Sequence, residues 1–95
     1  EISQAVRALF ISLDEPSLQV SFELAGNLRK AGIPVEVYPE AAKIKKQFSH
    51  AEKLAVPFAI IIGEEERTSQ TALVKNQQNG QQERVAFHAL VKYIS

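Results

Sequence analysis

Hydrophobic residues in this chain fall into short runs separated by segments with helical spacing. Residues 5–13 (AVRALFISL) and 56–62 (VPFAIII) are apolar almost throughout, which is typical of strands buried on both faces. Leu24, Leu28 and Ala31 recur at i, i+4 and i+7, which predicts a helix over residues 18–31 that ends at Gly32. Residues 35–38 form a short second strand. The first third of the chain is therefore predicted to be a βαβ unit with a right-handed crossover.

A second helix is predicted over residues 43–55, and its side chains divide into two faces. One face is apolar, spans about 60° of the helix and is expected to pack in the core. It consists of Ile44, Phe48, Ala51 and Ala55. The neighbouring face is basic, spans about 80° and consists of Lys43, Lys46, His50 and Lys53.

The last third of the chain alternates in the manner of paired strands. Gly63 ends the apolar run, and residues 64–68 are expected to form a charged loop. Residues 71–75 and 82–85 have strand character and flank a turn signal, NQQNG, so they are predicted to form a hairpin. Residues 86–94 close the chain as an amphipathic helix.

Three parallel strands followed by a hairpin predict a small α/β sandwich. Counted along the chain, the simplest strand order is 2-1-3, with the hairpin added at one edge. Ligands of such sheets meet the carboxyl ends of the parallel strands, which here are residues 13–14, 38–43 and 63–67. The basic start of the second helix and the acidic loop are therefore expected at the same edge.

Composition restricts the classes of function. With 95 residues the chain is expected to be one domain, residues 1–95, and because it starts with Glu1 and lacks Met we expect it to be a fragment of a longer protein. The absence of Cys excludes disulfide scaffolds, cysteine zinc modules and thiol catalysis. No apolar run has the length of a membrane span and no signal peptide opens the chain, so we expect a cytoplasmic location and no membrane partner.

Candidate chemistry favours binding over catalysis. The four glycines are scattered, which argues against a phosphate-binding glycine loop. Glu64 and Glu66 could be imagined as paired carboxylates, but no nucleophile or apolar pocket accompanies them. His50 and His88 lie on different predicted helices, which gives little support to a metal site, and His88 is expected to be half-buried. The basic helix face remains open to two interpretations, a solvated surface or a binding surface.

Several motifs in order resemble one known family. The segments KKQFSHAEKLAVPFAIIIGEEE (45–66) and TALVKNQQNGQQ (71–82) resemble the anticodon-binding domain of class IIa aminoacyl-tRNA synthetases, most of all that of histidyl-tRNA synthetases. The matching steps are Leu28-Arg29 with Gly32-Ile33, Lys43-x-x-Lys46-Gln47-Phe48, Gly63-Glu64-x-Glu66 and Val74-Lys75-Asn76. The resemblance extends over nearly the whole chain.

The resemblance implies a three-layer α/β/α sandwich with a five-stranded mixed sheet, and a tRNA anticodon loop as partner. The implied tRNA-binding residues are Lys43, Lys46, Gln47, Glu66 and Lys75. A carboxylate can accept from base amino or imino groups, and lysines can donate to base carbonyls or phosphates. The domain alone would be neither an enzyme nor a cofactor-binding unit. The longer protein would attach histidine to tRNA in a catalytic domain that uses ATP and magnesium, and would be a homodimer.

Three alternatives remain open from the sequence. Glu65 would take the place of Glu66 if the loop register were shifted by one residue. Glu66 and Lys75 could instead form a local salt bridge of little energetic consequence. The domain could also serve regulation or dimerisation in a synthetase-like protein without aminoacylation activity, because a fold does not fix a function.

Overall fold

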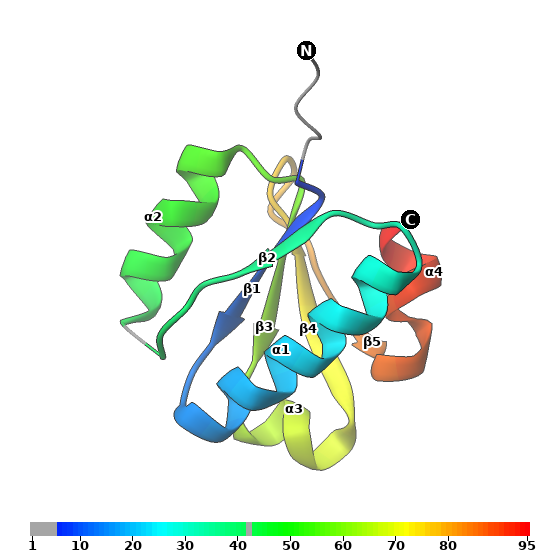
Figure 1. Cartoon of the computed structure of the whole chain (residues 1–95). Helices are drawn as coiled ribbons and strands as arrows, with labels where there is room; N and C mark the ends of the chain where they lie inside the picture. Colours follow the sequence, from blue (N-terminus) through cyan, green and yellow to red (C-terminus); the bar gives the residue numbers. More distant parts are fainter. Residues whose placement is uncertain (1–5, 42) are drawn as a thin grey trace.

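The computed structural model describes residues 6–41 and 43–95, and Ala5 and Ala42, which belong to predicted segments, lie outside this part. Strands and helices alternate along the chain up to β4, which is followed directly by β5 and a terminal helix (Figure 1). The elements are β1 (Ala8–Ser12), α1 (Glu15–Lys30), β2 (Val35–Val37), α2 (Ile44–Leu54), β3 (Phe58–Ile62), α3 (Glu64–Ser69), β4 (Thr71–Asn76), β5 (Gln82–Ala86), a 3-10 turn (Phe87–Ala89) and α4 (Leu90–Ile94).

The sheet has the order β2-β1-β3-β4-β5, which confirms the predicted arrangement of three strands with a hairpin at one edge. β1 pairs in parallel with β2 and β3, whereas β4 pairs antiparallel with both β3 and β5. The sheet is therefore mixed, as expected. Its parallel half contains the most apolar strands, and in β1 all five residues are buried.

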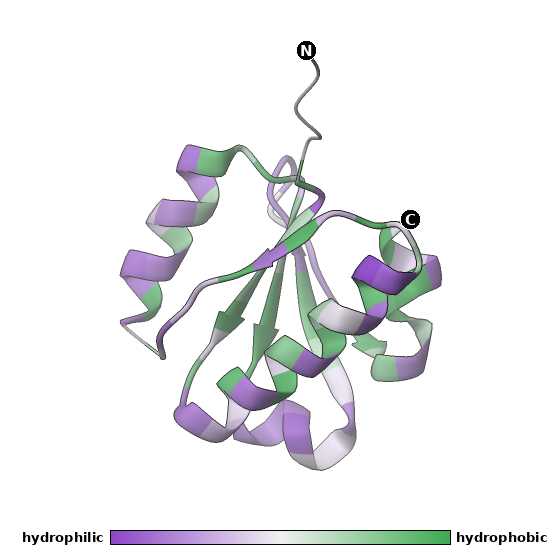
Figure 2. Ribbon diagram, in the orientation of Figure 1, coloured by the Kyte–Doolittle hydropathy of each residue, from purple (hydrophilic) through white to green (hydrophobic). Residues whose placement is uncertain are grey.

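Helices cover the two faces of the sheet unequally. On one face, α1 and α4 pack on a core that includes Phe10, Ile60 and Val74. On the other face, α2 packs on Leu9, Ile11 and the neighbouring part of β3. The central strands β1 and β3 are hydrophobic, and the outward side of α2 is largely hydrophilic (Figure 2). This arrangement is the predicted three-layer sandwich. Within the described residues, no helix is long and apolar enough to cross a membrane.

Helix α1 starts three residues earlier than the apolar spacing predicts. The Asp14 side chain accepts from the backbone N–H of Ser17 at 2.9 Å and caps the helix, with Pro16 in the first turn. At the other end Gly32 has a φ of +86°, a conformation that favours glycine. The capping residues therefore fix the helix bounds.

The predicted core face of α2 is partly wrong. Ile44, assigned to the apolar stripe, is 46% exposed, and Ala55 lies beyond the helix in the left-handed region with an exposed side chain. Ala51 is buried and Phe48 is half-buried, as predicted, and Gln47, which was not assigned to the stripe, is buried as well. A polar side chain can occupy a core-facing position when its hydrogen bonds are satisfied, and Gln47 is such a case.

The predicted charged loop is a short helix, α3. Its acidic first turn follows Gly63, and the Glu66 side chain accepts from the Gly63 N–H, which stabilises the helix start. At the carboxyl end of the chain, the predicted helix from residue 86 begins as the 3-10 turn and becomes α-helical only at Leu90. His88 lies on that turn and is exposed, so the expectation that it is half-buried is wrong.

Candidate nucleic-acid interface

Gln47 ties α2 to the carboxyl end of β1. Its Oε1 accepts from the Ser12 N–H at 3.0 Å, and its Nε2 donates to the Ser12 carbonyl at 2.9 Å. Ser12 and Gln47 are both fully buried. The Gln47 amide thus provides the two hydrogen bonds that a neighbouring strand would otherwise give to the Ser12 backbone. These bonds also hold the first turns of α2 at this edge.

Glu66 of α3 lies at the same carboxyl edge of the sheet, after β3. It is only 5% exposed; its Oε1 accepts from the Gly63 N–H at 2.9 Å and its Oε2 accepts from Arg84 at 3.0 Å. A Cβ at Gly63 would lie 2.7 Å from Leu13 Cδ1 and 3.0 Å from Glu66 Oε1, so a larger residue here would displace the exposed Leu13 side chain and press on Glu66. The neighbouring Glu65 is exposed and reaches Arg84 only at 3.8 Å.

The start of α2 and the acidic segment after Gly63 lie at the same edge of the sheet, which confirms the prediction. Ser12 bonds to Gln47 of α2, while the next residue, Leu13, donates its N–H to the carbonyl of Ile62, just before α3. Arg67 of α3 adds a third link, donating to Ser17 Oγ at 3.0 Å and approaching Asp14 Oδ2 at 3.4 Å. The carboxyl edge is therefore held together by hydrogen bonds from α1, α2 and α3.

This network makes one prediction about pH. The Ser17 hydroxyl and backbone N–H, with the Arg67 guanidinium nearby, hold the pKa of Asp14 below its ordinary value of 3.8. Asp14 therefore stabilises the fold above its unfolded pKa, and this contribution is lost as pH falls through the lower folded pKa. Because Asn also caps helices, Asp14→Asn should keep the helix start and flatten the acid end of the stability profile. Urea unfolding from about pH 6 to about pH 2 measures this, and an unchanged profile would show that Asp14 does not contribute.

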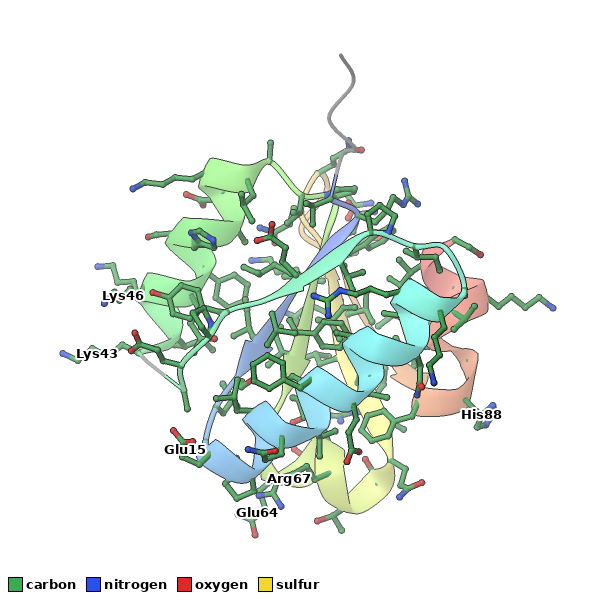
Figure 3. The ribbon with its side chains drawn as sticks, viewed as in Figure 1. Glu15, Lys43, Lys46, Glu64, Arg67 and His88 are labelled. Carbon is green, nitrogen blue, oxygen red and sulfur yellow. The ribbon has the colours of Figure 1, made fainter. Side chains whose placement is uncertain are left out.

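Lys43 and Lys46 extend outward from the start of α2 (Figure 3). Both side chains are exposed, and neither forms an ion pair with another residue of the described part of the chain. His50 is partly covered because its ring packs edge-to-face on Tyr38, with centroids 5.4 Å apart. Lys43 and Lys46 are thus solvated at the carboxyl edge and available to an anion, whereas Lys53 lies in the last turn of α2.

Lys75 lies on a different surface, the half of the sheet that α2 leaves uncovered. We call this surface the open sheet face; it consists of Thr71, Leu73, Lys75, Gln82 and Arg84. Direct pairing of Leu73 with Arg84 and of Lys75 with Gln82 places these side chains on one face of β4 and β5. The Lys75 ammonium lies 4.9 Å from the centroid of the Phe48 ring of α2, a cation-π distance.

The structure therefore separates two residues that the sequence placed together. Lys75 pairs with Ala59 near the start of β3, whereas Glu66 follows the end of that strand. The partner of Glu66 is Arg84, not Lys75, so the alternative of a salt bridge between Glu66 and Lys75 is wrong. Sequence reasoning missed Arg84 and assigned Phe48 only to the core. The strand register set by the hairpin turn was the signal that could have placed Arg84 opposite Leu73.

The two surfaces carry groups that can contact RNA. In the part of the chain that the structure describes, no three His, Cys, Asp or Glu side chains form a cluster that could hold a metal ion. The open sheet face carries two cations, Lys75 and Arg84, and the side-chain amide of Gln82, and the Phe48 ring of α2 borders it at Lys75. These groups suit the flat faces and polar edges of unpaired bases.

Comparison with known proteins points to one family. The model of the anticodon binding domain family matches residues 7–95. A histidine-tRNA ligase of Bacteroides fragilis is 36% identical over 91 residues, and the match covers 96% of this chain and 20% of that protein. A histidine-tRNA ligase of Helicobacter acinonychis is 44% identical over 82 residues, which are 86% of this chain and 19% of that protein. The chain therefore spans about a fifth of the length of these relatives.

Solved structures show the same relationship. The apo histidyl-tRNA synthetase of S. aureus superposes with a TM-score of 0.87 at 28% identity, covering 94% of this chain and 23% of that chain. The RNA binding domain of threonyl-tRNA synthetase from Cryptosporidium parvum superposes with a TM-score of 0.85 over 93% of this chain and 22% of that chain. At 20% identity the second likeness shows the shared fold alone.

Proposed function

Because this chain belongs to the anticodon-binding domain family, we propose that it is the part of a histidine-tRNA ligase that holds the anticodon loop of the tRNA. The similarity to histidine-tRNA ligases along almost the whole chain supports the choice of histidine. The remainder of the protein would carry the catalytic domain, with its ATP and magnesium, and would form a homodimer in the cytoplasm. This domain would then contribute recognition and no chemistry.

The open sheet face is the observation that carries the proposal. Phe48 offers a ring on which a base can stack, and Lys75 already occupies the position above that ring. A base could take that position while the ammonium moves to a phosphate or a base carbonyl, because stacking and cation contacts are the common means of holding unpaired nucleotides.

The predicted site residues divide into two proposed roles. Lys43 and Lys46 are exposed and Lys75 is half-buried over the Phe48 ring, and we assign all three direct contacts with the anticodon loop. Gln47 and Glu66 are buried and hydrogen-bonded to the fold, so their assigned role is to position α2 and Arg84. Their direct contact with bases stays a prediction.

Binding should be weak and strongly dependent on salt. The chain has 11 basic and 11 acidic residues and no net charge, so attraction to RNA depends on local groups alone. Each phosphate that a lysine neutralises contributes about 0.7 to the slope of log affinity against log salt concentration for a single-stranded partner.

Lys75→Gln is expected to lower affinity for a histidine-type anticodon stem-loop by about threefold to tenfold at low salt and to reduce the salt slope by about 0.7 to 1. Fluorescence anisotropy titrations at several salt concentrations measure both quantities. Lys92→Gln is the matched control, because Lys92 is exposed on α4, which packs against the opposite face of the sheet. Equal affinities and slopes for the two variants would contradict a role for the open sheet face.

A further inference from the structure

Arg84 of β5 lies beside two glutamates of α3 that hold it in different ways. Its Nη1 donates to Glu66 Oε2 at 3.0 Å and more weakly to Thr71 Oγ1 at 3.4 Å. Its Nη2 lies 3.8 Å from Glu65 Oε1, which is close enough for an ion pair but too long for a hydrogen bond. One edge of the guanidinium is therefore bound to the fold, and the other edge faces a carboxylate that it does not bind tightly.

The two glutamates differ in how easily they can leave Arg84. The Glu66 side chain is 7% exposed and also accepts from the Gly63 N–H at 2.9 Å, so its position is fixed. The Glu65 side chain is 80% exposed, and Arg84 at 3.8 Å is its one ion-pair partner within residues 6–41 and 43–95. Exposed ion pairs of this kind are weak, so little free energy keeps Glu65 beside Arg84.

Arg84 adds a second cation to the open sheet face. Leu73 pairs with Arg84 and Lys75 pairs with Gln82, so Arg84 and Lys75 are diagonal neighbours on β4 and β5, about 7–8 Å apart. The Arg84 side chain is 42% exposed and can be reached from solvent. A nucleotide chain that lies along this face would therefore meet both cations.

The guanidinium of Arg84 is prepared for a phosphate group. Its N–H groups form a planar fork that matches the oxygens of a phosphate. Because the bond from Nη1 to Glu66 already orients the fork, less conformational freedom is lost when the opposite edge donates to a ligand. Arg67, the arginine of α3, is different, because it donates to Ser17 and Asp14 and thereby links α3 to α1.

We propose that Arg84 binds a phosphate of the RNA backbone and that Glu65 competes with this phosphate for the same edge of the guanidinium. In the free domain, the Glu65 carboxylate is the anion next to Nη2. Binding of RNA replaces it by a phosphate oxygen and releases Glu65 to water, while Glu66 keeps Arg84 in place. This inference rests on the proposed function, because the phosphate belongs to the RNA partner. It adds a residue whose effect is to lower the affinity.

The test compares two substitutions that each remove one negative charge from the same exposed turn. Glu65→Gln should raise the affinity for a histidine-type anticodon stem-loop by about twofold to fivefold at low salt, because the phosphate no longer displaces a carboxylate. Glu64→Gln is the matched control. Glu64 is exposed and forms no ion pair in the described part of the chain, so its substitution changes only the overall charge. Fluorescence anisotropy measures both affinities.

Substitution of Arg84 shows whether this arginine is the group for which Glu65 and the phosphate compete. Arg84→Gln should weaken stem-loop binding by about threefold to tenfold. Glu65→Gln added to this variant should give no larger gain than Glu64→Gln gives, because the site of competition is gone. The glutamine amide can still donate to Glu66, and urea unfolding checks that the variant is folded. In the native chain, the Arg84 Nε–H resonance should shift as the stem-loop is added, a result that does not depend on any variant.

The outcomes separate this inference from the proposed function. Equal affinities of Glu65→Gln and Glu64→Gln, a lower affinity of Glu65→Gln, or an Arg84 resonance that RNA does not move would each overturn the inference. The proposed function would still stand if the native chain binds the stem-loop and Lys75→Gln weakens that binding. A native chain that does not bind the stem-loop would overturn both.

Discussion

Replacing Gln47 by leucine is expected to destabilise the domain by about 2–5 kcal/mol, because two buried backbone groups of Ser12 would lose their partners. Leucine is similar in size and keeps the apolar contacts, so the loss reports hydrogen bonding more than packing. Each buried group left unsatisfied costs about 1–3 kcal/mol. Urea unfolding followed by circular dichroism measures the change.

Ser49→Ala provides the control on the same helix, because Ser49 is exposed and its replacement should change stability by less than about 0.5 kcal/mol. Exchange of the Ser12 amide hydrogen should also become faster in Gln47→Leu, since its acceptor is removed. If Gln47→Leu were as stable as Ser49→Ala, the role assigned to Gln47 at the end of β1 would be wrong.

Glu66→Ala is expected to destabilise the domain by about 2–4 kcal/mol. The substitution removes the acceptor of the buried Gly63 N–H and leaves Arg84 without its closest carboxylate. Because Arg84 is partly exposed, water can replace that second partner, and the loss at Gly63 should dominate. Thermal and urea unfolding both measure the effect.

Glu65→Ala is the matched control, because its side chain is 80% exposed and lies 3.8 Å from Arg84. Such a pair contributes little, so the change should stay below about 1 kcal/mol. Equal effects of the two substitutions would contradict the assignment of the helix start to Glu66. Any RNA-binding measurement on Glu66→Ala must therefore be made where the variant is fully folded.

The sheet could be predicted from the sequence because its signals are local. Apolar runs, a glycine after the first helix and a hairpin turn fix the strands and their order, and the structure has that order. The short helix α3 could not be predicted in this way, because an acidic stretch of six residues has no apolar period. It forms because Glu66 caps it at Gly63, a contact that depends on the geometry of the strand before it.

The candidate site was less accessible to sequence reasoning, because its contacts join residues distant in the chain. Gln47 is buried because it is hydrogen-bonded to Ser12, 35 residues earlier. A helical wheel considers only the residues of one helix and so cannot predict this bond. Lys75 and Glu66 are only nine positions apart in the sequence. They lie at opposite ends of β3, because β4 runs antiparallel to β3 and Lys75 pairs with Ala59 near the start of that strand. Lys43 and Lys46 were easier to place, because a solvated face follows from helical periodicity alone.

The measurement that tests the account most directly is the affinity of this chain for a histidine-type anticodon stem-loop at low salt, compared with stem-loops in which single anticodon bases are altered. The account predicts preference for the native anticodon, reduced affinity for each altered stem-loop and a steep fall with salt. Equal binding to every stem-loop, or no binding at high protein concentration, would contradict recognition of the anticodon and favour a regulatory or dimerisation role for the same fold.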